Sequence, residues 1–341
     1  MTPVPISSPR GAITRRRALQ LVGSVAGCLL VPQVVVRAEA LRHEWTGAAL
    51  GAVAHITLYH PDAGAARSII RACLAEIDRL EGEFSLFRPD SALCRLNRDG
   101  VLVNPSLDMR RLLTEAVRFG DLSGGRFDVT VQPLWRLLAA HHAAHTVPPR
   151  ADLQAALALV DYHRIDIASR RIQLGRPGMA VTLNGIAQGY VTDRVAELLR
   201  ARGIEHVLLD LGELRALGSK PDGRPWRIGV RDPGRADHLL REFDVIDRAV
   251  ATSAGTAGPN ILDPRTGEGS ALYSSVTVVT PKATTADALS TILFLTPPDE
   301  AEALVAKAGP TAALLAGPEG DRIVENGWPF PQSGGNLARE R

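Results

Sequence analysis

The chain has 341 residues, of which 45% are hydrophobic and 22% are charged, as in ordinary globular proteins. Its formal net charge is +2, but residues 1–40 carry five arginines and one acid, so the remainder carries a net charge of −2. The basic character therefore belongs to the N-terminal segment, and the composition gives no support for a nucleic-acid-binding protein.

The first forty residues have the pattern of a removable export signal. Arg15-Arg16 precedes an uncharged apolar run at Leu21–Val36, and Ala38-Glu39-Ala40 follows it. A basic segment, an apolar segment and an A-x-A end describe a signal peptide, and paired arginines indicate the twin-arginine route. The run is shorter than the roughly 20 residues of a membrane-spanning helix. We expect a twin-arginine signal at 1–40 and a periplasmic mature protein that starts near Leu41.

The cysteines leave two questions open. Val25–Cys28 resembles a lipoprotein cleavage box, which would leave the protein anchored through Cys28. Because the apolar run continues beyond Cys28 to a better-placed cleavage site, we favour a soluble mature protein. Cys73 and Cys94 could pair in an oxidising compartment, but we expect buried thiols.

The mature part predicts helices and strands in mixed order, without a repeat. Apolar spacing predicts helices at Gly64–Glu83 and Leu107–Phe119. Thr192 is expected to cap a helix that Gly203 closes, and a strand at His206–Leu211 follows. Further predicted elements are strands at Trp226–Val230, Ser275–Val279 and Thr311–Leu315 and helices at Thr285–Leu295 and Pro298–Ala308. We expect one α/β domain (α+β, with a mixed sheet) at 41–327 and a loose tail at 328–341.

Two glycine-containing motifs could bring backbone N–H groups close to a ligand. Ser123–Thr130 contains a glycine pair suited to a phosphate or a ring system, or to a helix end followed by a strand. Leu183–Tyr190 places small residues before a helix N-terminus, which suits a diphosphate. A tight turn from strand to helix explains these glycines equally well.

Two further motifs carry polar side chains. Asp287 and Thr291 stand four residues apart, so that a carboxylate and a hydroxyl share one helical face, as Mg²⁺ ligands can. An Asp that complements the helix dipole is the alternative, and the spacing alone favours it. Arg265, in the turn Ile261–Gly267, could bind a phosphate or remain solvated. His141 and His145 share the same spacing, but they lie in a polar connector and we expect no metal there.

Taken in chain order, these motifs resemble the FAD:protein FMN transferases, the ApbE family. The resemblance also includes Phe84–Ser91 with Leu96-Asn97, and it extends over about Thr46–Leu315. Phe127–Trp135 and Leu183–Tyr190 are most similar to the NosX-like branch that accompanies nitrous oxide reductase. The resemblance implies a single domain with two lobes around an FAD cleft.

The family implies Mg²⁺-dependent transfer of FMN. A threonine hydroxyl of an acceptor protein attacks the diphosphate of FAD, FMN becomes attached through a phosphoester, and AMP leaves. The acceptor would be a NosR-like membrane-bound electron-transfer protein. Two alternatives stay open: a non-catalytic periplasmic flavin carrier, and an FAD diphosphatase that releases FMN and AMP.

The resemblance also implies site residues. Asp287, Thr291 and the backbone carbonyl of Gly185 correspond to the metal ligands. The flavin contacts correspond to Leu50, Phe87, Arg126, Phe127, Asp128, Thr182, Gln188 and Ile261. Leu50, Thr182 and Gln188 replace the usual Met, Asp and Lys.

Asn260 is a further departure from the family, at a position that we assign to catalysis. Many members carry a His there, two residues before the apolar-Asp-Pro-Arg-Thr-Gly sequence. If that His removes the proton from the acceptor hydroxyl, this chain lacks the base at 260. Three alternatives stay open: turnover is slow, another group takes the proton, or transferase activity is lost.

Overall fold

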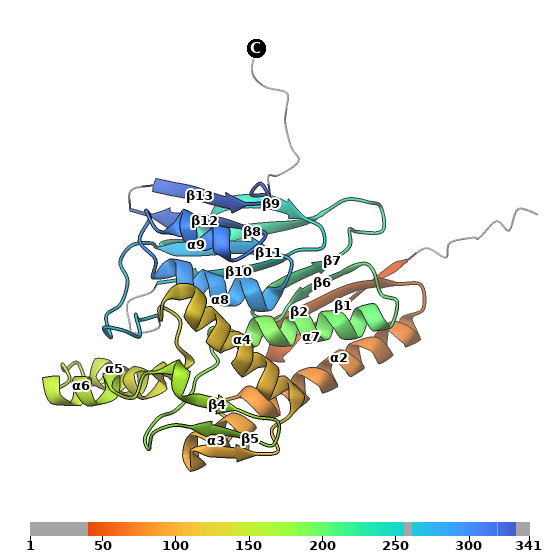
Figure 1. The fold of residues 1–341 in the computed structure, drawn as a ribbon. Coiled ribbons are helices and arrows are strands. Elements are labelled where there is room, and N and C mark those ends of the chain that lie inside the picture. The colour runs from red at the N-terminus through yellow and green to blue at the C-terminus, as the bar shows by residue number, and fades with distance from the viewer. Residues whose placement is uncertain (1–39, 256–260, 319, 332–341) are drawn as a thin grey trace, which may run out of the picture. The chain divides into compact units, whose positions relative to one another are not determined.

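An eight-stranded sheet organises the fold, in the order β1-β2-β6-β7-β10-β11-β12-β13 (Figure 1). This computed structural model describes residues 40–255, 261–318 and 320–331. The strands are β1 (Leu41–Ala49), β2 (Ala52–His60), β6 (Val207–Asp210), β7 (Leu214–Leu217), β10 (Ala249–Ala254), β11 (Ser275–Thr280), β12 (Thr311–Gly317) and β13 (Gly320–Asn326). The α/β class is confirmed, although the described strands of this sheet pair antiparallel rather than in mixed directions.

The sheet is covered on both faces, which explains its apolar strands. On one face lie the helices α2 (Ala63–Phe84), α7 (Ala187–Ala201) and α8 (Ala283–Phe294) (Figure 1). The ribbon of β8 (Trp226–Asp232) and β9 (Arg235–Val245) packs on the other face. Every residue of β11 is buried, as expected for a strand with a layer on each side.

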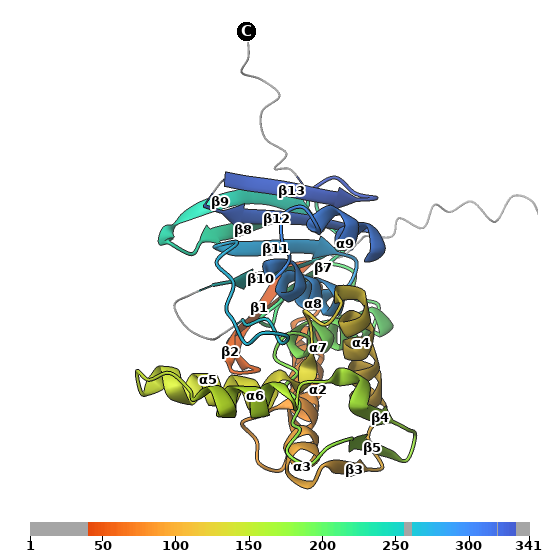
Figure 2. The same cartoon turned by 60° about the vertical axis from the view of Figure 1, so that its left-hand side comes forward.

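A smaller lobe lies below this sheet in Figures 1 and 2. Its helices are α3 (Ala92–Asp99), α4 (Leu107–Ser123), α5 (Gln132–Ala143) and α6 (Arg150–Leu157), with short 3₁₀ turns η1 (Val129–Val131) and η2 (Tyr162–Arg164). Its sheet contains β3 (Val101–Val103), β5 (Arg171–Leu174) and β4 (Ile165–Ile167), in that order. The last helix, α9 (Ala301–Lys307), packs on β12 and β13. In the described ranges, no helix combines the length and the apolar character that crossing a membrane requires.

The predicted cap at Thr192 is wrong. Thr192 is fully buried inside α7, and its hydroxyl donates to the carbonyl of Gln188 at 2.8 Å. The helix begins earlier, at Ala187, because its first turns are buried between neighbouring elements. Tertiary packing, rather than a local capping signal, therefore sets this helix start.

Two other expectations can be compared with the structure. Cys73 and Cys94 are free thiols, Cys73 buried and Cys94 half-buried, and burial raises the pKa of Cys73 to about 12. The predicted loose tail does not begin at Trp328. Phe330 is 2% exposed and meets Phe243 edge to face, with ring centroids 5.1 Å apart. Residues 332–341 lie outside the described ranges.

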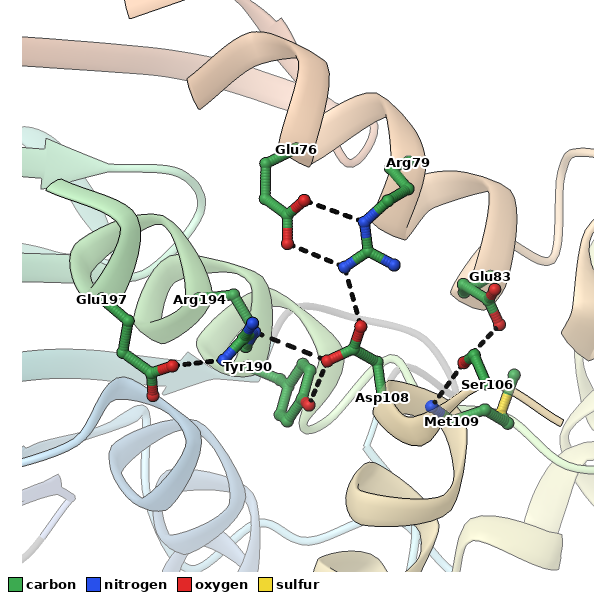
Figure 3. Close-up of polar contacts among 9 residues, drawn as sticks. All are labelled: Glu76, Arg79, Glu83, Ser106, Asp108, Met109, Tyr190, Arg194 and Glu197. Atoms are coloured by element: carbon green, nitrogen blue, oxygen red, sulfur yellow. Dashed lines mark hydrogen bonds and ion pairs between the residues drawn. The ribbon is translucent and has the colours of Figure 1, made fainter. Parts of the chain in front are cut away.

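A charged network joins α2, α4 and α7 (Figure 3). Asp108, in the first turn of α4, accepts hydrogen bonds from Arg79 of α2 at 2.7 Å and from the Tyr190 hydroxyl of α7 at 2.8 Å. The Nε of Arg194 lies 3.4 Å from the same carboxylate. Burial raises the pKa of Asp108, but Tyr190 and the two guanidinium groups outweigh it, so that the pKa lies below its ordinary value. This network positions α7, whose N-terminal end lines the site described next.

We expect Asp108→Asn to destabilise the protein by about 3 kcal/mol at pH 7, the lower end of the cost of breaking a buried pair. The pKa of Asp108 is lower in the folded state than in the unfolded state, where it is about 3.9. The charged carboxylate therefore adds to the free energy of unfolding at pH values above about 3.9, and this stabilisation is lost as the pH falls through the folded-state pKa. Urea unfolding should therefore show a smaller difference between the two proteins at pH 3.5. Asp99→Asn, at an exposed pair with Arg98, is the control. An Asp108→Asn penalty that is equal at both pH values would contradict this assignment.

Candidate active site

Residues from distant parts of the chain line a cavity of about 310 Å³ between the smaller lobe and the sheet-bound helices. Nine residues that the sequence analysis selects share this lining: Arg126, Phe127, Asp128, Thr182, Gly185, Gln188, Ile261, Asp287 and Thr291. They come from the turn after α4, the entry to α7, the segment after β10 and the face of α8. The fold therefore brings the four separate motifs into one place.

Three predicted site residues are not part of this lining. Leu50 lies in the turn between β1 and β2, is half-buried, and donates its backbone N–H to Glu81. Phe87 is 86% exposed on the loop between α2 and α3. Asn260 lies outside the described residues. Their roles stay predictions.

The motif at 123–130 is a helix end followed by a 3₁₀ turn rather than by a strand. Gly124 adopts a left-handed conformation (φ 60°) that ends α4, and Gly125 follows with φ 81°. The Asp128 carboxylate accepts hydrogen bonds from Thr130 N–H at 2.7 Å, the Thr130 hydroxyl at 2.6 Å and Tyr162 N–H at 3.1 Å. Burial nevertheless raises the pKa of Asp128. Asp128 thus fixes the turn that presents its neighbours to the cavity.

Arg126 and Phe127 are the two side chains that this turn presents. One guanidinium nitrogen of Arg126 donates to Glu300 at 2.8 Å, whereas its Nε is buried and has no partner among the described residues. The Phe127 ring lies against Gly185, where an added Cβ would be 3.2 Å from it. A cation with spare donors beside an aromatic ring suits a ligand that has both phosphate and a flat ring.

A close approach of α7 to α8 shapes the other end of the cavity. A Cβ on Gly189 would overlap the Ala283 carbonyl oxygen and lie 2.8 Å from the Asp287 Cβ, so only glycine fits. The Gly189 N–H donates to the Asp287 carboxylate at 2.9 Å. In a regular helix this N–H would bond to the carbonyl four residues back, that of Gly185. Among the described residues none donates to the Gly185 carbonyl, which is left available for a ligand.

Three hydroxyl groups lie together where β10 packs on α8. A Cβ on Gly185 would be 3.4 Å from the Thr291 Oγ1, so these two groups are neighbours. Ser253 of β10, which the sequence analysis did not select, lies 3.4 Å from the Thr291 Oγ1 and 2.8 Å from the Ser290 Oγ. Nothing in the local sequence of β10 indicates this role, because it arises only from the packing of β10 on α8.

The acids of the cavity are strongly buried. Asp287 is 4% exposed, and burial raises its pKa to about 7, with Asp193 adding to the rise and the Gly189 N–H opposing it. Glu213, in the turn between β6 and β7, lines the same cavity and is 8% exposed. Burial and the nearby carboxylates of Asp287 and Asp210 raise its pKa well above the ordinary value. The sequence analysis missed Glu213, because an acid between two short strands carries no local signal that it is buried.

The donor set fits a hard divalent cation. The carboxylate of Asp287, the hydroxyl of Thr291 and the Gly185 carbonyl are all oxygen donors, which Mg²⁺ combines with water and phosphate oxygens. The described ranges hold no group of three or more His, Cys, Asp and Glu side chains placed to bind a metal. A cation here would therefore take most of its ligands from neutral oxygens and water, as Mg²⁺ does.

Comparisons with known proteins identify the family of the chain. Residues 50–315 match the model of the ApbE family. An FAD:protein FMN transferase of Vibrio cholerae is 33% identical over 241 residues, which cover 64% of this chain and 72% of the relative. One of Escherichia coli is 27% identical over 287 residues, which cover 78% and 81%.

Solved structures give the same result. The flavin transferase ApbE from Vibrio cholerae matches with a TM-score of 0.74 and 25% identity over 84% of this chain and 98% of that one. The apo Pseudomonas stutzeri flavinyl transferase ApbE matches with a TM-score of 0.74 and 26% identity over 84% and 95%. The predicted family is thus confirmed, and the chain belongs to the ApbE family.

Proposed function

We propose that this protein is an FAD:protein FMN transferase that uses Mg²⁺ to attach FMN to a threonine hydroxyl of an acceptor protein. The curated relatives carry that enzyme name. One observation carries the metal part of the proposal. The Gly189 N–H is turned to Asp287, so that the Gly185 carbonyl remains unbonded among the described residues, in the cavity that Asp287 and Thr291 also line.

The reaction breaks the phosphoanhydride bond of FAD and forms a phosphoester bond to the acceptor. The acceptor hydroxyl loses its proton and its oxygen bonds to the phosphorus of the FMN half of FAD, while the bond from that phosphorus to the bridging oxygen breaks and AMP leaves with the electron pair. The diphosphate resists attack because its oxygens are anionic. A divalent cation, when bound, supplies the positive charge that neutralises these oxygens, which contributes several kcal/mol.

The chain's own residues then have separate tasks. Asp287, Thr291 and the Gly185 carbonyl hold the cation. Arg126 lines the cavity, and its guanidinium group can bind a phosphate oxygen there. Phe127 provides an apolar face for the flavin. Asp128 keeps both of these residues in place through its three hydrogen bonds.

Mass measurement tests the activity. The purified protein is incubated with FAD, Mg²⁺ and a candidate acceptor, and the acceptor should gain the mass of one FMN less one water. A flavin carrier would bind FAD and leave the acceptor mass unchanged. An FAD diphosphatase would release free FMN and AMP without an acceptor. Either result would overturn the transferase proposal.

We also propose a periplasmic location and a NosR-like membrane-bound electron-transfer protein as the acceptor. The similarity of Phe127–Trp135 to the NosX-like branch supports this acceptor, and Arg15-Arg16 supports twin-arginine export. Replacing both arginines with lysine should keep the precursor in the cytoplasm, and fractionation measures this. The mature N-terminus separates two forms: a start at Leu41 supports the soluble protein, and a lipid-blocked Cys28 contradicts it.

The amide side chain of Asn260 leads to a prediction about how the acceptor hydroxyl loses its proton. An amide cannot accept a proton near neutral pH, whereas an imidazole can. If no other group replaces the family's His, Asn260→His should raise the single-turnover transfer rate by up to about 10²-fold and introduce a rise near pH 6.5. Rates at pH 5.5–8.5 for both proteins measure this. A wild-type profile that already has an imidazole-like step would contradict it.

A further inference from the structure

The cavity contains a second buried carboxylate to which the proposed function gives no task. Glu213 is 8% exposed and Asp287 is 4% exposed, and both line the same cavity. Glu213 approaches from the sheet, in the turn between β6 and β7, while Asp287 approaches from α8. Burying a charge without a partner costs several kcal/mol, and two like charges in one cavity add repulsion to that cost.

The groups around Glu213 do not balance its charge. The Thr252 N–H is the group that favours the charged carboxylate, whereas Asp287 and Asp210 oppose it. In the part of the chain that the structure describes, no Lys, Arg or His forms an ion pair with Glu213. Arg215, two residues further along β7, forms no ion pair with Glu213, and its Nε and one terminal nitrogen are buried without a partner among the described residues. Within the described ranges, the buried Glu213 carboxylate therefore has no cationic side chain beside it to balance its charge.

We propose that Glu213 is a second charged ligand of the cation at Asp287, bound to it directly or through one coordinated water. The inference rests on the cation of the proposed function. Asp287 and the available Gly185 carbonyl would hold the ion from the helix side, and Glu213 from the sheet side. A divalent ion between them replaces the repulsion of two carboxylates with two attractions, and a pair of carboxylates is a common ligand set for Mg²⁺. The cation thus ties α7 and α8 to the turn between β6 and β7.

Mn²⁺ binding to the FAD-free protein, measured by electron paramagnetic resonance, tests this inference. Glu213→Gln keeps the size of the side chain and should raise the Kd for Mn²⁺ at least tenfold, as loss of a supporting ligand typically does. The same substitution should raise the Tm of the metal-free protein, because it removes a buried ionisable group that no cationic side chain of the described residues balances. Asp210→Asn is the matched control, since Asp210 lies near Glu213 but does not line this cavity. Its Kd should stay within about threefold of wild type.

The outcomes separate this inference from the proposed function. Suppose that Glu213→Gln binds Mn²⁺ with a Kd within about threefold of wild type, while Asp287→Ala still abolishes binding. That result overturns the role of Glu213 and leaves the proposed function standing. Absence of Mn²⁺ binding in the wild type overturns both. If Glu213→Gln does not fold, an anomalous map of Mn²⁺-soaked wild-type crystals decides. A peak within about 5 Å of a Glu213 carboxylate oxygen, the reach of one bridging water, supports the proposal, and a larger distance overturns it.

Discussion

Replacing Asp287 with alanine is expected to lower Mg²⁺-dependent FMN transfer by about 10³-fold. The loss corresponds to about 4 kcal/mol, within the several kcal/mol that a correctly held cation contributes to a phosphoryl transfer. The folded state should survive, because the buried carboxylate is a source of strain in the metal-free protein: burial raises its pKa to about 7. Initial rates of acceptor labelling at saturating FAD, over a series of Mg²⁺ concentrations, measure the effect.

Two controls make the Asp287 result specific. Asp299→Asn removes an exposed acid just after α8 and should leave the rate unchanged. The thermal midpoint of Asp287→Ala without Mg²⁺ should equal or exceed that of the wild type, and Mg²⁺ should no longer raise it. Activity of Asp287→Ala within about threefold of wild type would show that this carboxylate does not hold the cation.

Gly189→Ala is expected to damage both stability and activity. The new methyl group would overlap the Ala283 carbonyl and press on the Asp287 Cβ, so α7 and α8 must separate. Overpacking of this kind costs typically 1–3 kcal/mol, and we expect the upper end because backbone, rather than a flexible side chain, is in the way. Separation of the helices also breaks the bond from the Gly189 N–H to Asp287. We therefore expect at least a tenfold loss of transfer rate on top of the loss of stability.

Gly82 provides the matched control, because it is also a glycine inside a helix. An added Cβ at Gly82 of α2 would meet nothing within 4 Å. Gly82→Ala should therefore stabilise the protein by about 0.5–1 kcal/mol, the usual gain from alanine in a helix. Urea unfolding of the two variants should give shifts of opposite sign. Equal shifts would mean that the contact between α7 and α8 is looser than the structure shows.

The long amphipathic elements could be predicted from the sequence because their apolar spacing already states which face is buried. The helices at Gly64–Glu83 and Leu107–Phe119 correspond to α2 and α4. The start of α7 could not be predicted in this way. A glycine such as Gly189 ordinarily indicates a turn, but here it allows two helices to touch, and only the packed structure shows that.

The site residues could be predicted where they belong to motifs whose order along the chain indicates the family. The spacing of Asp287 and Thr291 alone favoured a simple dipole interaction, and the family resemblance changed that interpretation. Glu213 could not be selected, because an acid between two short strands usually lies in a solvated turn. Its burial depends on contacts with β10 and α8, which are distant in sequence. Leu50 and Phe87 stay untested, since they lie on turns outside the described cavity.

The position of β2 in the sheet has a consequence for the timing of folding. β2 is hydrogen-bonded to β1 on one side and to β6 on the other, with His55 opposite Asp210. The whole smaller lobe is encoded between these two strands, so the ribosome must complete it before the sheet can grow beyond its first hairpin. Closing such a long loop slows folding and leaves an unpaired strand edge exposed during synthesis. The nascent chain should therefore depend on chaperones until β6 has emerged.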